Sequence, residues 1–473
     1  MKLLPVLVLL LWGGLAVSCK RSEPTPARLA AAHRQQDHAK DSAHRWFTTN
    51  LVGAYERVGQ HDPQWDGPAK TALNLMAAGR SGEAKLTTEW SRDVSSLAQS
   101  AVDHGCTDPL VRYVALRYRV GDMKRSDAET AKAFQDIAAD MGRSGYSPYL
   151  NFYALMRAAE SLKATLPENN PPQTEMALVH ELRRQSLQNL LQALHDPTTP
   201  ESEIYVMSSA LMEMVRLNDR EFPEYWSGLD ATLRDQWPKS AQADLLRGWY
   251  YRTYAWQARG SGFADKVTPE GARLFDERLK LADQALQSGW KKDNTDTRIA
   301  TEMIKVCTGL GKDRAEMELW FQRAMLTAPD NYDACQAKLH YLKPIWFGSS
   351  EEMLAFGHEC VSNTNWSGRV PLVLTEAHGF LSAYGRNDSA SRQAYWLQPE
   401  VWPDLRAAYE AFFRNEPEAG GWRPNYALHA YKCQAWDDLN AQLQQLGPVN
   451  YNFFGGRAAF DRMVAEAKNH AKP

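Results

Sequence analysis

Helix-start signals recur along the whole chain, whereas the alternating β-branched pattern of a strand is almost absent. Three Thr-Pro pairs place a capping hydroxyl before a proline at the first helical position, where the missing N–H costs nothing. These pairs are Thr25-Pro26, Thr199-Pro200 and Thr268-Pro269. Capping boxes begin at Ser126 and Ser349, each with a glutamate three residues later. The runs between these starts are amphipathic at helical spacing, so the sequence predicts an all-α fold.

Paired helices of a tetratricopeptide-like array repeat about every 34 residues. The segment 297–329 comes nearest to this pattern, with helices expected over 298–310 and 313–327. Phe321, Ala324 and Pro329 stand where that repeat has its aromatic, its small residue and its terminating proline. The period drifts elsewhere, because an inserted loop is expected at 261–269 and a long turn at 343–350. We therefore predict a degenerate tetratricopeptide-like solenoid of helix-turn-helix pairs.

The chain is long enough for one elongated repeat domain or for two to three compact ones. A break near Trp237-Pro238-Lys239-Ser240 favours a division into two helical halves. The expected segments are a signal peptide over 1–18, a tether over 19–27, an N-terminal half over 28–239, a C-terminal half over 240–465 and a tail over 466–473.

The first nineteen residues form an export signal. Lys2 precedes an apolar run from Leu3 to Leu11, and small residues then lead to Cys19. A cysteine directly after the cleavage point resembles a bacterial lipoprotein signal, in which the sulfur of Cys19 carries the lipid. The departure from that pattern is Ala16, where such signals usually have leucine, and the alternative is an ordinary secretory signal cut nearby. Lys20 stands where retention at the inner membrane favours aspartate, so the resemblance points to the outer membrane, facing the periplasm.

The charge balance excludes one class of partner. The chain carries 54 basic and 57 acidic residues, a net charge of −3, and removal of Lys2 with the signal makes it one unit more negative. A phosphate backbone is neutralised by an excess of Lys and Arg that this chain does not have. We therefore expect no nucleic-acid partner. No later segment approaches the 18 consecutive apolar residues of a second membrane crossing.

Three groups of motifs lie between about residues 243 and 360. The first group is Gly248-Trp249-Tyr250-Tyr251, Ala255-Trp256-x-Ala258-Arg259-Gly260-x-Gly262 and Leu274-Phe275-x-x-Arg278-Leu279. The second is Trp320-Phe321-x-Arg323-Ala324-Met325 and Pro329-Asp330-Asn331-Tyr332-x-Ala334-Cys335. The third is Lys338-Leu339-x-Tyr341-Leu342 and Pro344-x-Trp346-x-Gly348-Ser349. Together they resemble the bacterial family called domain of unknown function 4034, which implies a helical repeat-like domain and supplies no reaction or catalytic residue.

No catalytic, cofactor or metal site emerges from the motifs. HExxH, CxxC, GxSxG and Walker patterns are absent, and the nearest histidine grouping, His33, His38 and His44, cannot reach one ion from a single helix. Arg259-Gly260-Ser261-Gly262 follows an expected helix rather than a strand, so we expect Gly260 to end that helix in a left-handed turn with Arg259 facing its negative end.

Aromatic residues supply the candidate binding surface. Sixteen tryptophans and nineteen tyrosines are expected mainly to pack between helices, although aromatic side chains also stack on sugars and anchor interfaces. Trp346 stands apart because it lies in a Gly/Ser-rich loop after Pro344. The candidate binding surface consists of Trp256, Arg259 and Trp346.

Five cysteines follow Cys19, an odd number with wide spacing, so we expect disulfides not to be the framework of this fold. If 332–343 and 351–362 form an antiparallel hairpin, Cys335 and Cys360 are nearly equidistant from its turn. The pair is then either a disulfide or two buried free thiols.

The sequence alone favours a lipid-anchored envelope scaffold that binds a protein partner or an envelope polymer, because stacked helix pairs create a long concave surface. Two alternatives remain open. A cell-wall glycan or peptide-directed enzyme predicts two converging carboxylates, and a carbohydrate-binding module predicts several coplanar exposed aromatics.

Overall fold

The computed structural model describes residues 26–119, 127–216, 218, 220–262 and 264–470, and for residues 26–39 and 264 only the backbone. Cys19, Thr25 and Ser126, which carry predictions made above, lie outside the described residues.

The described residues form helices and no strand, which confirms the predicted all-α solenoid. In the N-terminal part, the described residues form α1 Pro26–Val58, α2 Asp66–Ser81, α3 Thr88–Asp103, α4 Pro109–Arg117, α5 Asp127–Arg143, α6 Pro148–Thr165, α7 Gln173–Ala193, α8 Glu201–Val215 and α9 Glu221–Gln236. The C-terminal part contains α10 Ala241–Arg259, α11 Pro269–Lys292, α12 Thr297–Leu310, α13 Arg314–Leu326, α14 Tyr332–Tyr341, α15 Ser350–Ser362, α16 Val373–Ala383, α17 Ser389–Trp396, α18 Val401–Asn415, α19 Arg423–Lys432, α20 Trp436–Leu443 and α21 Arg457–Asn469. Short 3₁₀ helices occur at Ala264–Lys266, Val370–Leu372 (η2), Gly420–Trp422 (η3) and Tyr451–Phe454.

Local capping chemistry explains several of these boundaries. The hydroxyls of Thr268 and Ser349 accept hydrogen bonds from backbone N–H groups in the first turns of α11 and α15, as the sequence predicts. The expected cap at Thr199 is wrong. Thr199 is buried, and its hydroxyl donates instead to the carbonyl of Ala193 at 3.3 Å, so α8 begins one residue after Pro200.

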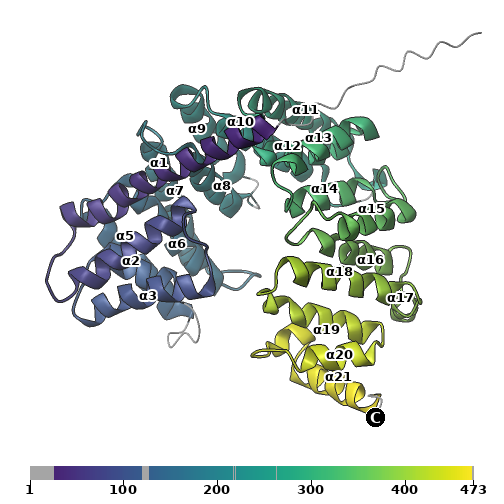
Figure 1. The fold of residues 1–473 in the computed structure, drawn as a ribbon. Helices are drawn as coiled ribbons and strands as arrows, with labels where there is room; N and C mark the ends of the chain where they lie inside the picture. Colours follow the sequence, from purple (N-terminus) through teal and green to yellow (C-terminus); the bar gives the residue numbers. More distant parts are fainter. Residues whose placement is uncertain (1–25, 120–126, 217, 219, 263, 471–473) are drawn as a thin grey trace, which may run out of the picture.

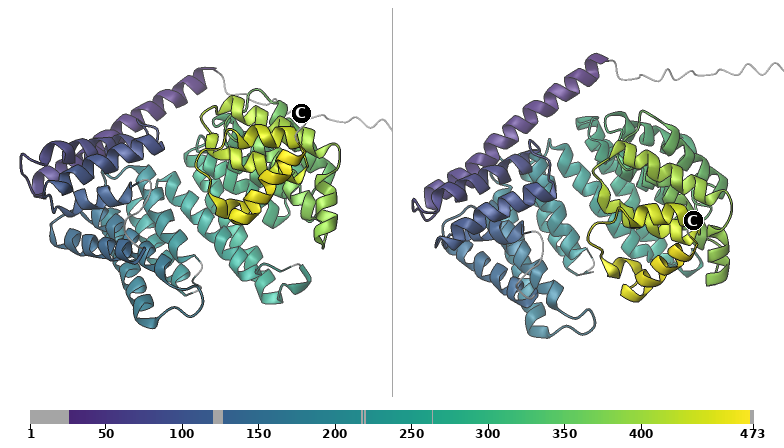
Figure 2. Two further views of the ribbon diagram at one scale, coloured as in Figure 1. Left: turned by 90° about the horizontal axis from the view of Figure 1, so that it is seen from below. Right: turned by 60° about the horizontal axis from the view of Figure 1, so that its bottom comes forward.

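Most successive helices contact each other along the chain, and α10, α12, α14, α16 and α18 also form a continuous series of next-but-one contacts. Figure 1 shows the resulting arch, with α1–α9 in one arm and α14–α21 descending in the other. The two further views in Figure 2 keep these arms distinct, so the arch does not arise from one viewing direction. This arrangement exposes one face of the even-numbered helices from α10 to α18.

Among the described residues, the hydrophobic core consists of two large clusters and a small one. The first large cluster extends from Trp46 to Tyr250, the second from Ala241 to Tyr426, and the small one joins α19, α20 and α21. The expected division at 239/240 falls just before α10, a helix that contributes side chains to both large clusters.

Candidate functional site

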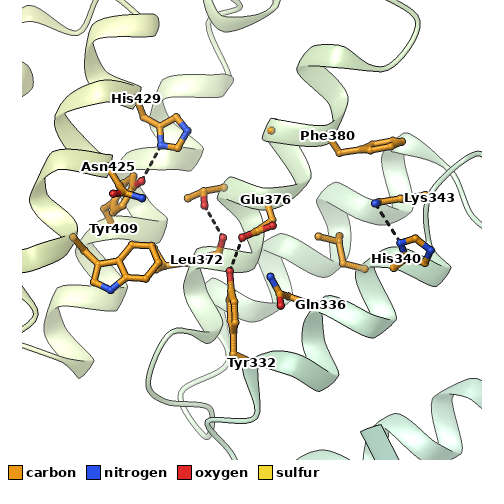
Figure 3. Close-up of a pocket in the computed structure, with 14 residues that line it drawn as sticks. Tyr332, Gln336, His340, Lys343, Leu372, Glu376, Phe380, Tyr409, Asn425 and His429 are labelled. Carbon is orange, nitrogen blue, oxygen red and sulfur yellow. Dashed lines mark hydrogen bonds between the residues drawn. The ribbon is translucent and has the colours of Figure 1, made fainter. Parts of the chain in front are cut away.

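Two adjoining hollows lie on the C-terminal part of the solenoid. One has a volume of about 530 Å³, and we call it the Trp346 hollow. The other has a volume of about 470 Å³ and is drawn in Figure 3; we call it the Glu376 hollow. Gln336 and His340 of α14 line both of them, so the two hollows adjoin along α14, and we call them together the groove.

The groove is built almost entirely from alternate helices. The Trp346 hollow is lined from α10, α12 and α14 and by Trp346 in the loop after α14. The Glu376 hollow is lined from α14, η2, α16, α18, η3 and α19, and by Lys343 just beyond α14. Helices α11, α13, α15 and α17 contribute no lining residue to either hollow. The groove is therefore the face that the even-numbered helices leave open when the helix pairs stack.

The structure brings together the three residues of the predicted binding surface. The rings of Trp256 and Trp346 meet edge to face, with centroids 5.9 Å apart and an interplanar angle of 88°. The guanidinium carbon of Arg259 lies 5.4 Å from the Trp256 ring and 6.0 Å from the Trp346 ring. Both tryptophans line the Trp346 hollow, and Arg259 packs against their rings.

Arg259 is held in place by the end of α10. Its Nη1 donates hydrogen bonds to the carbonyls of Gly260 and Gly262, at 3.3 and 3.0 Å. Gly260 has the expected positive φ, 75°, but its ψ of 178° is extended rather than left-handed helical, which corrects the predicted turn. The extended ψ leads the chain away from the helix axis and presents both carbonyls to Arg259.

Arg252 and Lys305 form the polar wall of the Trp346 hollow, and both pair with the buried carboxylate of Glu302. Arg252 Nε donates to one oxygen of Glu302 at 2.5 Å, and Lys305 Nζ donates to the other at 2.7 Å. Burial alone raises the pKa of the Glu302 carboxyl, but the charges and hydrogen bonds of Arg252 and Lys305 lower it to about 2. Glu302 therefore remains ionised at neutral pH. Sequence reasoning missed this group, although Arg252, Trp256 and Arg259 are spaced to share one face of α10.

The Glu376 hollow contains polar side chains that form hydrogen bonds with one another (Figure 3). The Tyr332 hydroxyl donates to Glu376 Oε1 at 2.8 Å, and the Tyr409 hydroxyl lies 2.8 Å from His429 Nδ1. Burial, with Lys432 and His378 as smaller causes, lowers the pKa of His429 to about 3. The imidazole of His429 is therefore neutral at physiological pH.

His340 separates the two hollows and carries no charge at neutral pH. The Lys343 ammonium donates to its Nδ1 at 3.3 Å. Burial, followed by the Lys343 charge, lowers the pKa of His340 to about 4. The His340 side chain therefore contributes polar atoms but no charge where the two hollows meet.

The carboxylates that line the groove are divided between its two hollows. Among the described residues, Asp333 lines the Trp346 hollow and Glu376 lines the Glu376 hollow, whereas glycan hydrolysis uses a pair of carboxylates that flank one bond. Across the described residues no group of three or more His, Cys, Asp or Glu is placed to hold a metal ion. Within the same residues, no helix has the length and apolar character needed to span a bilayer.

Cys335 of α14 and Cys360 of α15 are buried free thiols with exposed fractions of 0% and 1%. The Cys335 thiol donates to Met325 Sδ at 3.7 Å. Burial, followed by contact with Cys335, raises the pKa of the Cys360 thiol. The two free thiols are therefore neighbours. The disulfide between them stays a prediction.

We expect oxidised glutathione to convert this pair to a disulfide worth about 3–4 kcal/mol in free energy of unfolding. A non-reduced digest should then contain peptides joined through Cys335 and Cys360, and denaturation should expose two fewer thiols. Cys335→Ser provides the control, since its free energy of unfolding should not respond to oxidant. Full alkylation of both cysteines in oxidised, denatured protein would contradict the prediction.

Comparison with protein-family models gives no match to this chain, and a search of curated proteins gives none either. The resemblance to domain of unknown function 4034 therefore stays a prediction.

Proposed function

We propose that this protein is an envelope lipoprotein, anchored through Cys19, that uses the groove to hold a protein partner. The observation that supports the binding role is that the Trp346 and Glu376 hollows adjoin, with lining residues from α10, α12, α14, α16, α18 and α19. An elongated groove on one face of a helical array suits an extended chain, because each helix pair adds a short stretch of contact surface.

The orientation of the groove aromatics favours protein over glycan. Sugar rings stack on aromatic platforms that face them, and a carbohydrate-binding surface is expected to present several coplanar rings. Trp256 and Trp346 instead stand at 88° to each other. A right-angled corner encloses one bulky side chain, as in the aromatic anchor pockets of protein interfaces.

The proposed anchor determines where the partner is held. Cys19 in the lipoprotein pattern would carry several acyl chains, each contributing about 0.8 kcal/mol per buried CH₂, which makes attachment effectively permanent. The helical part would then act in the periplasm, next to the outer membrane. The groove would hold its partner close to that surface.

We expect a discrete protein to copurify with the tagged chain from detergent-solubilised envelopes, identified by mass spectrometry. Gln336→Arg should abolish its capture, because Gln336 lines both hollows and a longer charged side chain fills the groove. Gln322→Arg is the matched control, since Gln322 is exposed on α13 and lines neither hollow. Cys19→Ala should release the protein, with its partner, from the membrane fraction.

Two outcomes would overturn parts of this proposal. Recovery of cell-wall glycan fragments without a protein would favour the carbohydrate-binding or enzymatic alternatives. Equal capture by Gln336→Arg and Gln322→Arg would place the partner elsewhere on the solenoid.

A further inference from the structure

We propose that the Trp346 hollow recognises an acidic peptide segment in which a bulky apolar side chain stands next to a carboxylate. This inference rests on the proposed function and names the chemistry of the segment that enters the groove. Its three supports are an aromatic corner, a positively charged wall and an open end.

The aromatic corner selects a bulky apolar side chain. Trp256 and Trp346 form two walls at 88°, and Ala337 leaves room between them and α14. Phe275 and Arg259 pack against the corner from outside the hollow, with the Arg259 guanidinium carbon 5.9 Å from the Phe275 ring. Phe275 and Arg259 therefore support the tryptophan rings in this arrangement. A side chain that enters the corner loses contact with water on two sides.

The polar wall selects a carboxylate. Among the described residues, Glu302 is the one carboxylate that pairs with Arg252 or Lys305, and both of its oxygens are taken by these two cations. Two positive charges therefore share one negative charge. Lys305 keeps an exposed fraction of 35% at its side chain, so its ammonium can reach a ligand. The wall has an excess of one positive charge next to the apolar corner, in a protein whose net charge is −3.

The other ionisable groups at the hollow cancel one another. Among the described residues, Asp333 is the one carboxylate in the lining, exposed in the first turn of α14, and it contributes one negative charge. The Arg259 guanidinium against the two tryptophan rings contributes one positive charge, so the excess of one remains. His340 is neutral, and the Lys343 ammonium beside it adds positive charge between the hollows.

The open end of the Trp346 hollow favours a peptide over a small molecule. The hollow adjoins the Glu376 hollow at Gln336 and His340, so a ligand anchored at Trp346 can extend along α14 towards α16. Main-chain amides of an extended segment can bond to the polar side chains there, including Asn425 and Glu376. A small amphipathic acid would fill the first hollow alone.

The test begins with selection from a library of random twelve-residue peptides on the full chain carrying Cys19→Ala. We expect enriched peptides to contain Asp or Glu within two positions of an aromatic or branched aliphatic residue. Enrichment of basic peptides, of peptides without an acidic residue, or of none would overturn the inference.

Two protein variants with opposite expected effects separate recognition from folding. Lys305→Met should weaken binding of the best acidic peptide about threefold, because a half-exposed charge pair is partly screened by solvent. Glu302→Gln should strengthen it, because it frees Arg252 and Lys305 for the ligand. Lys291→Met, at an exposed position on α11, is the control and should change nothing. Fluorescence anisotropy gives these ratios, and circular dichroism verifies that each variant is folded.

Replacing the peptide's acidic residue by its amide should cost about tenfold in affinity for the wild-type chain. The loss should be smaller with Lys305→Met. If both variants weaken binding equally, the wall is structural and the inference fails.

The two proposals fail in different ways. A protein partner that is lost with Gln336→Arg, while no acidic peptide binds, would leave the proposed function standing and remove this inference. Binding of a small aromatic carboxylate as tightly as the best peptide would show that the hollow accepts a small molecule rather than a peptide.

Discussion

Lowering the pH from 8 to 5 is expected to reduce the free energy of unfolding of the C-terminal part by about 4 kcal/mol. The cause lies in His340 and His429, whose folded pKa values of about 4 and about 3 lie below their ordinary value of 6.5. Both imidazoles are neutral in the folded chain, so their stabilising contribution is complete above pH 6.5. As the pH falls from 6.5 to 5, the unfolded chain binds protons that the folded chain does not. Each pH unit over which the unfolded chain holds one more proton changes the free energy of unfolding by about 1.4 kcal/mol. The fall from pH 6.5 to 5 therefore removes about 2 kcal/mol for each histidine.

Urea unfolding followed by tryptophan fluorescence at pH 8 and pH 5 measures this loss. His429→Gln should reduce the loss between pH 8 and pH 5 by about 2 kcal/mol, whatever it does to stability at pH 8. His195→Gln is the control, because His195 is exposed on the N-terminal part. Glu302 does not confuse the result, since a carboxyl with a folded pKa of about 2 and an ordinary value of 4.5 loses its contribution only at lower pH. An unchanged pH dependence in His429→Gln would contradict the prediction.

Glu203→Ala is expected to destabilise the N-terminal part by about 3–5 kcal/mol. Glu203 of α8 is 4% exposed, and its Oε2 accepts hydrogen bonds from Arg80 at 2.5 Å and from the Tyr153 hydroxyl at 3.1 Å. The guanidinium of Arg80 lies over the Tyr153 ring, 4.4 Å from its centroid. Removing the carboxylate leaves the Arg80 charge buried without its ion-pair partner. It also removes the hydrogen bonds that join α2 and α6 to α8.

Thermal and urea unfolding of Glu203→Ala and Glu213→Ala make the comparison. Glu213 lies on the same helix but is exposed, and its pair with Arg216 is a surface ion pair worth at most about 1 kcal/mol. Both variants remove one carboxylate from α8, so helix propensity is matched. Equal losses in the two variants would show that the buried network contributes no more than a surface pair.

The sequence predicts the helices better than it predicts their assembly, because capping and periodicity are local. The helices expected over 298–310 and 313–327 are observed as α12 and α13 with boundaries shifted by one residue at most. Thr199 shows where local reasoning fails. Its Thr-Pro pair has the right chemistry for a cap, but tertiary burial directs its hydroxyl to the Ala193 carbonyl.

The groove depends on long-range packing, and the sequence therefore gives only fragments of it. Trp256, Arg259 and Trp346 could be proposed from a loop position and a helix face. Glu302 could not, since it is 50 positions away from Arg252 and nothing local joins them. The neutral histidines of the Glu376 hollow are likewise products of burial, which no spacing in the sequence reveals.

Helix α10 belongs to both large cores at once. Ala243, Leu246 and Tyr250 pack into the first, whereas Ala241 and Leu245 pack into the second. Tyr250 also stacks on Trp226 of α9, with ring centroids 4.3 Å apart. A fragment that ends at residue 239 would leave this stacking surface uncovered, and a fragment that begins later than α10 would lose one wall of the groove. A cut at 239/240 would therefore leave the whole of α10 with the C-terminal piece and deprive the N-terminal core of the side chains that this helix supplies to it.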